Sequence, residues 1–70
     1  MANVEAEMVA NVWKVLVQAG SAVGEGDTLV ILESMKMEIP VVSPQAGTVT
    51  ALNVVEGGVV QEGDVIAVVD

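Results

Sequence analysis

The chain has 70 residues and a formal charge of −8, with ten acidic side chains against two lysines, and it contains no cysteine and no histidine. One domain fits this length, and the missing residue types exclude a disulfide framework, a thiolate zinc site and the commonest general base of enzymes. The acidic charge and the single aromatic residue, Trp13, also exclude a nucleic-acid-binding protein, which needs a basic surface.

Four short segments rich in aliphatic and β-branched residues follow one another along the chain and predict β-strands. Each is too short for a helix, and glycines or prolines lie in every gap between them. Val12 and Val17 cannot face the same side of a flat strand, because they are an odd number of residues apart, so we expect a bulge or a strong twist between them. The four segments are Val12–Val17, Leu29–Leu32, Val49–Val55 and Val65–Val69.

An internal repeat organises these segments. Residues 11–33 align without a gap with residues 48–70 at a shift of 37 positions, and seven of the 23 pairs are identical. The shared pairs include two Gly-Asp steps, Gly26-Asp27 and Gly63-Asp64, which predict turns, since each offers too few oxygen ligands for a calcium site.

The repeat predicts a single all-β domain in which two similar halves, residues 1–33 and 38–70, pack against each other about a pseudo-twofold axis. The expected architecture is a flattened barrel or sandwich. The linking turn, residues 34–37, is equivalent by the repeat to the two chain ends, so we expect it at the opposite end of the molecule from both termini.

The linking turn has an unusual sequence, with Met35, Lys36 and Met37 at its centre. Tight hairpin turns favour glycine, asparagine, aspartate or serine, so a local rule is broken here. The ordinary interpretation is a solvated lysine with two methionines packed at the edge of the core. The competing interpretation is a modification site, because one of only two basic residues of an acidic chain would stand at the tip of a hairpin.

These residues resemble those of the biotinyl domain, the carrier module of biotin-dependent carboxylases, in its small free-standing form. The resemblance covers nearly the whole chain, and its most specific element is Met35-Lys36-Met37 within Glu-Ser-Met-Lys-Met-Glu. The resemblance implies a flattened barrel of two four-stranded antiparallel sheets, with Lys36 as the biotinylated residue. Its neighbours in the attachment site would be Glu33, Ser34, Met35, Met37 and Glu38.

The resemblance also implies a function. A biotin protein ligase would attach biotin to Lys36, and the arm would carry a carboxyl group from a biotin carboxylase subunit to a carboxyltransferase subunit, as in an acyl-CoA carboxylase. The chain itself would be a carrier and not an enzyme. The longest apolar run, Val65–Val69, is far shorter than a membrane helix, so we expect no membrane contact and a cytoplasmic protein. We also expect the isolated protein to be monomeric.

Two alternatives remain open. The first is a lipoyl carrier, or a carrier of both biotin and lipoate, since lipoyl domains use a similar fold with a lysine in the same turn; the methionines beside Lys36 favour biotin. The second is an unmodified interaction module, which needs the repeat but not Lys36. The chain also departs from the family pattern, with Ser34 where many members have alanine and Ala10 where a glycine is expected before the first long strand.

Overall fold

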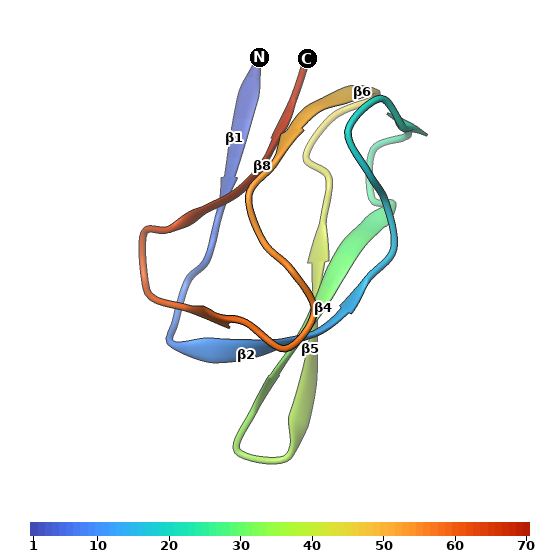
Figure 1. Ribbon diagram of the computed structural model, residues 1–70. Coiled ribbons are helices and arrows are strands. Elements are labelled where there is room, and N and C mark those ends of the chain that lie inside the picture. The colour runs from blue at the N-terminus through green and yellow to red at the C-terminus, as the bar shows by residue number, and fades with distance from the viewer.

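The computed structural model describes all 70 residues and consists of eight β-strands without a helix (Figure 1). No element is therefore a helix that could cross a membrane. The strands are β1 (Ala2–Glu5), β2 (Ala10–Val15), β3 (Ala22–Val23), β4 (Thr28–Ser34), β5 (Met37–Val42), β6 (Gly47–Leu52), β7 (Val59–Val60) and β8 (Val65–Val69).

The strands form two four-stranded sheets, in the orders β1-β8-β6-β3 and β5-β4-β2-β7. Every paired strand is antiparallel to its neighbour. The two sheets face each other and enclose one core. Each sheet has one apolar face, and packing the two faces together removes both from water. The prediction of an all-β sandwich with two four-stranded antiparallel sheets is confirmed.

The four strands predicted from the sequence are β2, β4, β6 and β8, the central strands of the two sheets. The predicted segments reach too far at two ends, because β2 stops at Val15 and β6 stops at Leu52. The bulge expected in the first segment is confirmed: Val12 lies opposite Leu32 but Lys14 lies opposite Ile31, so Trp13 is the extra residue. Strand β6 has the same irregularity on its β8 side.

Hydrogen bonds repeat across the molecule at the 37-residue interval of the sequence repeat. The Gly20 N–H donates to the Val49 carbonyl at 2.7 Å, and the Gly57 N–H donates to the Val12 carbonyl at 2.9 Å, so each half holds the other in the same way. Both Gly-Asp steps are turns, as predicted. Asp27 and Asp64 each accept a hydrogen bond from the backbone N–H three residues earlier, at 2.8 and 2.9 Å.

The core is made of small aliphatic side chains from both halves. Its most deeply buried members come in repeat-related pairs, such as Leu29 with Ile66 and Leu32 with Val69, all 2% exposed or less. Burying this apolar surface is the main term that stabilises so short a chain. The 13 core residues are Val4, Ala6, Ala10, Val12, Val23, Leu29, Val30, Leu32, Val49, Val60, Ile66, Ala67 and Val69.

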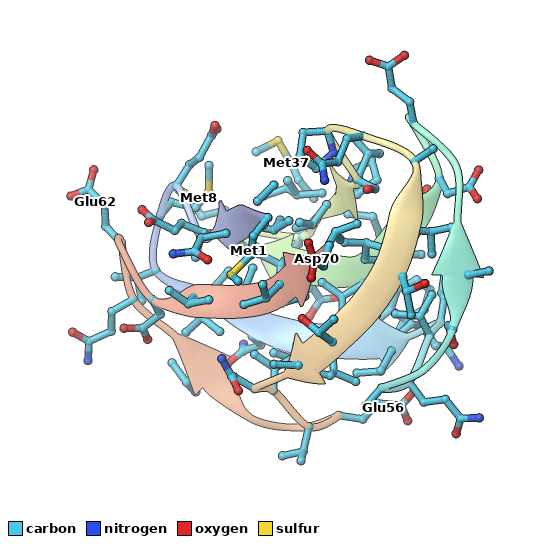
Figure 2. All side chains as sticks on the ribbon, turned by 90° about the horizontal axis from the view of Figure 1, so that it is seen from above. Met1, Met8, Met37, Glu56, Glu62 and Asp70 are labelled. Carbon is cyan, nitrogen blue, oxygen red and sulfur yellow. The ribbon has the colours of Figure 1, made fainter.

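The molecule is elongated, with dimensions of 31 × 17 × 17 Å. Figure 1 shows the two termini side by side at one end and the β4–β5 hairpin projecting at the other, as the repeat predicts. Met1 and Asp70 also lie close together in the view from above (Figure 2), where the Met1 amino group is 3.7 Å from a carboxylate oxygen of Asp70. The linking turn is therefore the part of the chain farthest from its ends.

Candidate functional site

The turn between β4 and β5 is carried by the most extensive strand pairing in the molecule. Ser34 lies opposite Met37, and the pairing continues through Glu33 opposite Glu38 and on toward the core. One residue below this pair, Leu32 is almost fully buried, so the base of the hairpin is fixed by core packing. The two residues at the tip, Met35 and Lys36, are thus held on a rigid support.

The backbone of these two residues is left-handed. Met35 has a φ of 52° and Lys36 a φ of 65°, and they are the only residues other than glycine with a positive φ. Two such residues in succession define a two-residue hairpin turn of type I′, which normally contains asparagine and glycine. A side chain in this conformation costs about 1 kcal/mol or more at each position. The turn therefore keeps a methionine and a lysine at the expense of stability.

The side chains of the turn face solvent. Met35 is 89% exposed and Met37 57% exposed, and neither joins the core. The interpretation of these methionines as residues packed at the edge of the core is therefore wrong for this hairpin. The reason is geometric. Met35 lies in the turn, beyond the last cross-strand pair, and Met37 begins the edge strand β5, so no further strand covers either side chain.

Lys36 is exposed, and its amine forms no ion pair and no hydrogen bond. Glu33 and Glu38 face each other across the hairpin and are also exposed, but neither contacts the lysine as an ion-pair partner. Like charges directly opposite on a hairpin are mildly destabilising. Ser34 closes the turn opposite Met37 and is half-buried, which suits a small side chain.

The second lysine has a different environment. Lys14 lies on β2, within the sheet, and its amine stands 5.4 Å from the centre of the Trp13 ring. The sequence predicts an ordinary exposed charge for Lys14, and a Trp13 that is partly buried or covers one sheet edge. Both predictions are confirmed, since Lys14 is exposed and Trp13 is 42% exposed on the bulge, and the structure adds the contact between the two side chains. Lys36 differs from Lys14 in standing at the tip of a hairpin, away from any aromatic ring.

This arrangement can accept a covalent group on the amine, since the amine is accessible, unpaired and presented on a fixed loop. The chain has no histidine or cysteine, and the structure contains no cluster of three acidic residues that could hold a metal ion. The residues around Lys36 therefore fit an attachment site.

Comparisons with known proteins identify the family of the chain. The family model described as "Biotin-requiring enzyme" matches residues 2–69. The chain is 62% identical to the biotinylated protein TB7.3 homolog of Mycolicibacterium smegmatis over 68 residues, covering 97% of this chain and 96% of that protein. It is 48% identical to the biotin/lipoyl attachment protein of Bacillus subtilis over 64 residues, covering 91% of this chain and 88% of that protein.

Solved structures show the same fold inside much larger enzymes. The urea carboxylase of Kluyveromyces lactis matches 99% of this chain with a TM-score of 0.91 and 30% identity, and a single-chain, multi-domain long-chain acyl-CoA carboxylase matches 94% with a TM-score of 0.86 and 30% identity. In each case the match covers only 6% of the enzyme's chain. With the whole chain matched by the family model and by relatives of nearly its own length, this protein belongs to the biotin-requiring family as a biotin carboxyl carrier domain.

Proposed function

We propose that Lys36 carries biotin, and that the protein shuttles a carboxyl group between two active sites of a biotin-dependent carboxylase. The observation that carries this proposal is the turn itself. In a chain of this family, the exposed and unpaired Lys36 amine stands on a type I′ turn whose two residues are strained. A fold without a use for Lys36 would gain stability from asparagine and glycine at this point.

Attachment requires a second protein. The chain contains no histidine and no side chain is hydrogen-bonded to the Lys36 amine, so the residues of the turn would not activate it as a nucleophile. A biotin protein ligase would supply both the base and an activated biotinyl-adenylate. After the base of the ligase takes a proton from the Lys36 amine, the amine nitrogen would displace AMP from the acyl carbon, and the resulting amide would carry no positive charge. The ligase would read the shape of the turn, because the hairpin holds the lysine backbone in one conformation.

The residues of the turn would then position an arm. The lysine stem with the biotin side chain spans roughly 12 to 14 Å when extended. Biotin, once bound, supplies the carboxyl-carrying chemistry, while the protein contributes the tether and the high local concentration that a tether gives. Met35 and Met37, exposed on both sides of Lys36, would provide adaptable apolar contacts inside partner pockets.

The partners in this proposal are a biotin carboxylase subunit and a carboxyltransferase subunit, as in an acyl-CoA carboxylase, and all acid, base and metal chemistry belongs to them. The chain itself would be non-catalytic and would work in the cytoplasm. Support comes from the long-chain acyl-CoA carboxylase whose chain contains a segment of the same fold. The match to a urea carboxylase is equally close in identity, so the acceptor of the carboxyl group is a property of the partner.

The test is the mass and streptavidin binding of the protein purified from its own cells. We expect one biotinyl group per chain and retention on streptavidin. Lys36→Arg should abolish both while leaving the thermal unfolding temperature within about 2 °C of wild type. Lys14→Arg is the matched control, because it alters the only other lysine and should be biotinylated normally. Biotin on Lys14, or on the Lys36→Arg variant, contradicts the proposal.

Lipoate is the second candidate for the same lysine, and one relative is named for both groups. The intact mass separates the two, since a lipoyl increment without streptavidin binding replaces biotin by lipoate. An unmodified scaffold predicts no mass increment, and full biological function of the Lys36→Arg variant.

A further inference from the structure

The repeat provides an internal control for the surface of the molecule. Residues 37 positions apart occupy equivalent places in the two halves, so a residue type that the fold requires should be similar in both. Where both positions are exposed but their chemistry differs, the fold does not explain the difference. Such positions point to contacts outside the molecule.

Seven exposed positions carry a large apolar side chain where the equivalent residue is exposed and small or polar. Two of them lie apart from the others, Met1 at the N-terminus (equivalent to Glu38) and Val42 on β5 (equivalent to Glu5). The other five belong to one side of the sheet β5-β4-β2-β7. They lie on or beside β2 and β7, and we call them the β2–β7 face: Val9, Trp13, Leu16, Val55 and Val59. Their equivalents on or beside β6 and β3 are exposed as well, but are small or polar: Ala46, Thr50, Asn53, Gln18 and Ala22.

Strand pairing brings the members of the β2–β7 face together. Asn11 of β2 lies opposite Val59, which places Val9 and Trp13 on either side of this pair. The Gly57 N–H donates to the carbonyl of Val12, so the turn that contains Val55 runs beside the bulge. The side chains of Val9, Trp13 and Val59 and the turn that contains Val55 therefore lie together at the edge of the sheet, and Leu16 follows Trp13 three residues along the chain.

The charge of this surface is also distinctive. In a chain of net charge −8 it contains Lys14, one of the two cations, held over the Trp13 ring at 5.4 Å. The nearby acid, Glu56, accepts a hydrogen bond from the Val15 N–H at 3.0 Å, so its carboxylate is directed to the backbone. A partner surface that is apolar and carries a carboxylate opposite Lys14 would be complementary.

The position of the face relative to Lys36 identifies the kind of partner. Strand β2 pairs with β4, and Asn11 lies opposite Glu33, three residues before Lys36. A protein bound to the β2–β7 face therefore contacts the same sheet that carries the hairpin. The apolar residues of the face expose on the order of 500 Å². This is less than the roughly 800 Å² per partner of a stable interface, so it suits a brief encounter and not a permanent dimer.

We infer that the β2–β7 face docks the catalytic subunit of the carboxylase that takes up the Lys36 arm, through an apolar contact surface with an acidic residue facing Lys14. This inference rests on the proposed function. It adds a second contact to the tip of the hairpin, so that the protein would be recognised by a face as well as by its arm.

The test replaces apolar residues by those found at the equivalent positions of the other half. The variant Trp13→Thr/Leu16→Asn/Val59→Ala carries residue types that the same fold already accommodates when exposed, so its unfolding temperature should remain near that of wild type. The matched control is Gln18→Ala/Thr50→Ala/Asn53→Ala on the other sheet. Both are biotinylated and then used as substrates of the purified biotin carboxylase subunit and, separately, of the carboxyltransferase subunit.

We expect the face variant to raise the KM for the carrier at least about tenfold in one of the two half-reactions, with kcat little changed and with wild-type streptavidin binding. Lys14→Glu should raise the same KM, and the control variant should not. An unchanged KM in both half-reactions overturns the inference. So does a slower biotinylation of the face variant, which would assign the surface to the ligase, or a wild-type dimer that this variant dissociates. Failure of the wild-type protein to become biotinylated instead overturns the proposed function.

Discussion

Strain in the lysine-bearing turn can be measured by giving the turn the residues that its backbone prefers. The variant Met35→Asn/Lys36→Gly places asparagine and glycine where the chain has φ values of 52° and 65°. Nothing else should change, because Met35 is 89% exposed and the Lys36 amine has no ion-pair or hydrogen-bond partner. The change in stability therefore reports the backbone preference of the turn.

The magnitude follows from two opposing terms. Left-handed conformation costs an ordinary residue about 1 to 2 kcal/mol, and glycine removes this cost while asparagine lowers it. Glycine also makes the unfolded chain more flexible, which lowers the stability of the folded protein by about 0.5 to 1 kcal/mol. The net gain for the double variant is about 1 kcal/mol. In a domain of this size, that raises the unfolding temperature by roughly 4 to 8 °C.

The assay is thermal unfolding followed by circular dichroism or calorimetry. Single variants at Met35 show how the stability depends on the residue type at one position of the turn. Met35→Asn alone should be slightly more stable than wild type and should retain Lys36 for modification. Met35→Val should be less stable than wild type, since a β-branched side chain tolerates positive φ poorly. If the double variant is no more stable than wild type, or Met35→Val costs nothing, the turn is not strained and the argument from its sequence fails.

Three further predictions concern other parts of the structure. Asp27→Ala should cost about 1 kcal/mol in thermal unfolding because it removes the acceptor of a 2.8 Å hydrogen bond, and Asp27→Asn should recover most of this loss by keeping an oxygen there. Gly47→Ala should lower the stability by about 1 to 3 kcal/mol in the same assay, since the new Cβ would lie 2.5 Å from the Asp70 carbonyl oxygen. Unchanged stability of this variant would mean that the backbone at Asp70 moves away at no cost, which would contradict the prediction. Dilute hydrogen peroxide should oxidise Met35 several-fold faster than Met8 in the folded protein, as their exposures are 89% and 39%, and peptide mass mapping that finds equal rates would place Met35 in contact with the protein.

The sequence was sufficient for the features that depend on local pattern and on the repeat. The valine-rich segments predicted the central strands, and the odd spacing of Val12 and Val17 predicted the bulge that falls at Trp13. The four edge strands β1, β3, β5 and β7 were not among the predicted segments. Strands β3 and β7 have only two residues each, and an edge strand has one unpaired side and can include residues such as Pro40 of β5. The linking turn could also be singled out from the sequence, since methionine and lysine are not the residue types that tight turns usually contain.

Which side chains are exposed could not be predicted from the sequence in the same way. Whether Trp13 packs in the core or stands on a face depends on the side of the bulge to which it belongs, and the position of the bulge is set by the pairing of β2 with β4, a strand that begins at Thr28. A signal was nevertheless present in the repeat. Trp13 aligns with Thr50 and Val59 with Ala22, and such mismatches at exposed positions mark a surface once the exposure is known.

The same symmetry explains how one small fold can work in such different chains. The linking turn and the two termini occupy equivalent ends of the sandwich, and only one of these ends carries Lys36 (Figure 1). Additional polypeptide joined beside Met1 or Asp70 would extend from the end opposite the lysine, where it would leave the hairpin uncovered. This geometry suits the solved carboxylases in which the same fold makes up 6% of the chain, and also relatives of almost this chain's own length. A domain of this fold therefore needs no change to be joined to a longer chain, because the repeat keeps the chain ends and the lysine-bearing turn at opposite ends of the molecule.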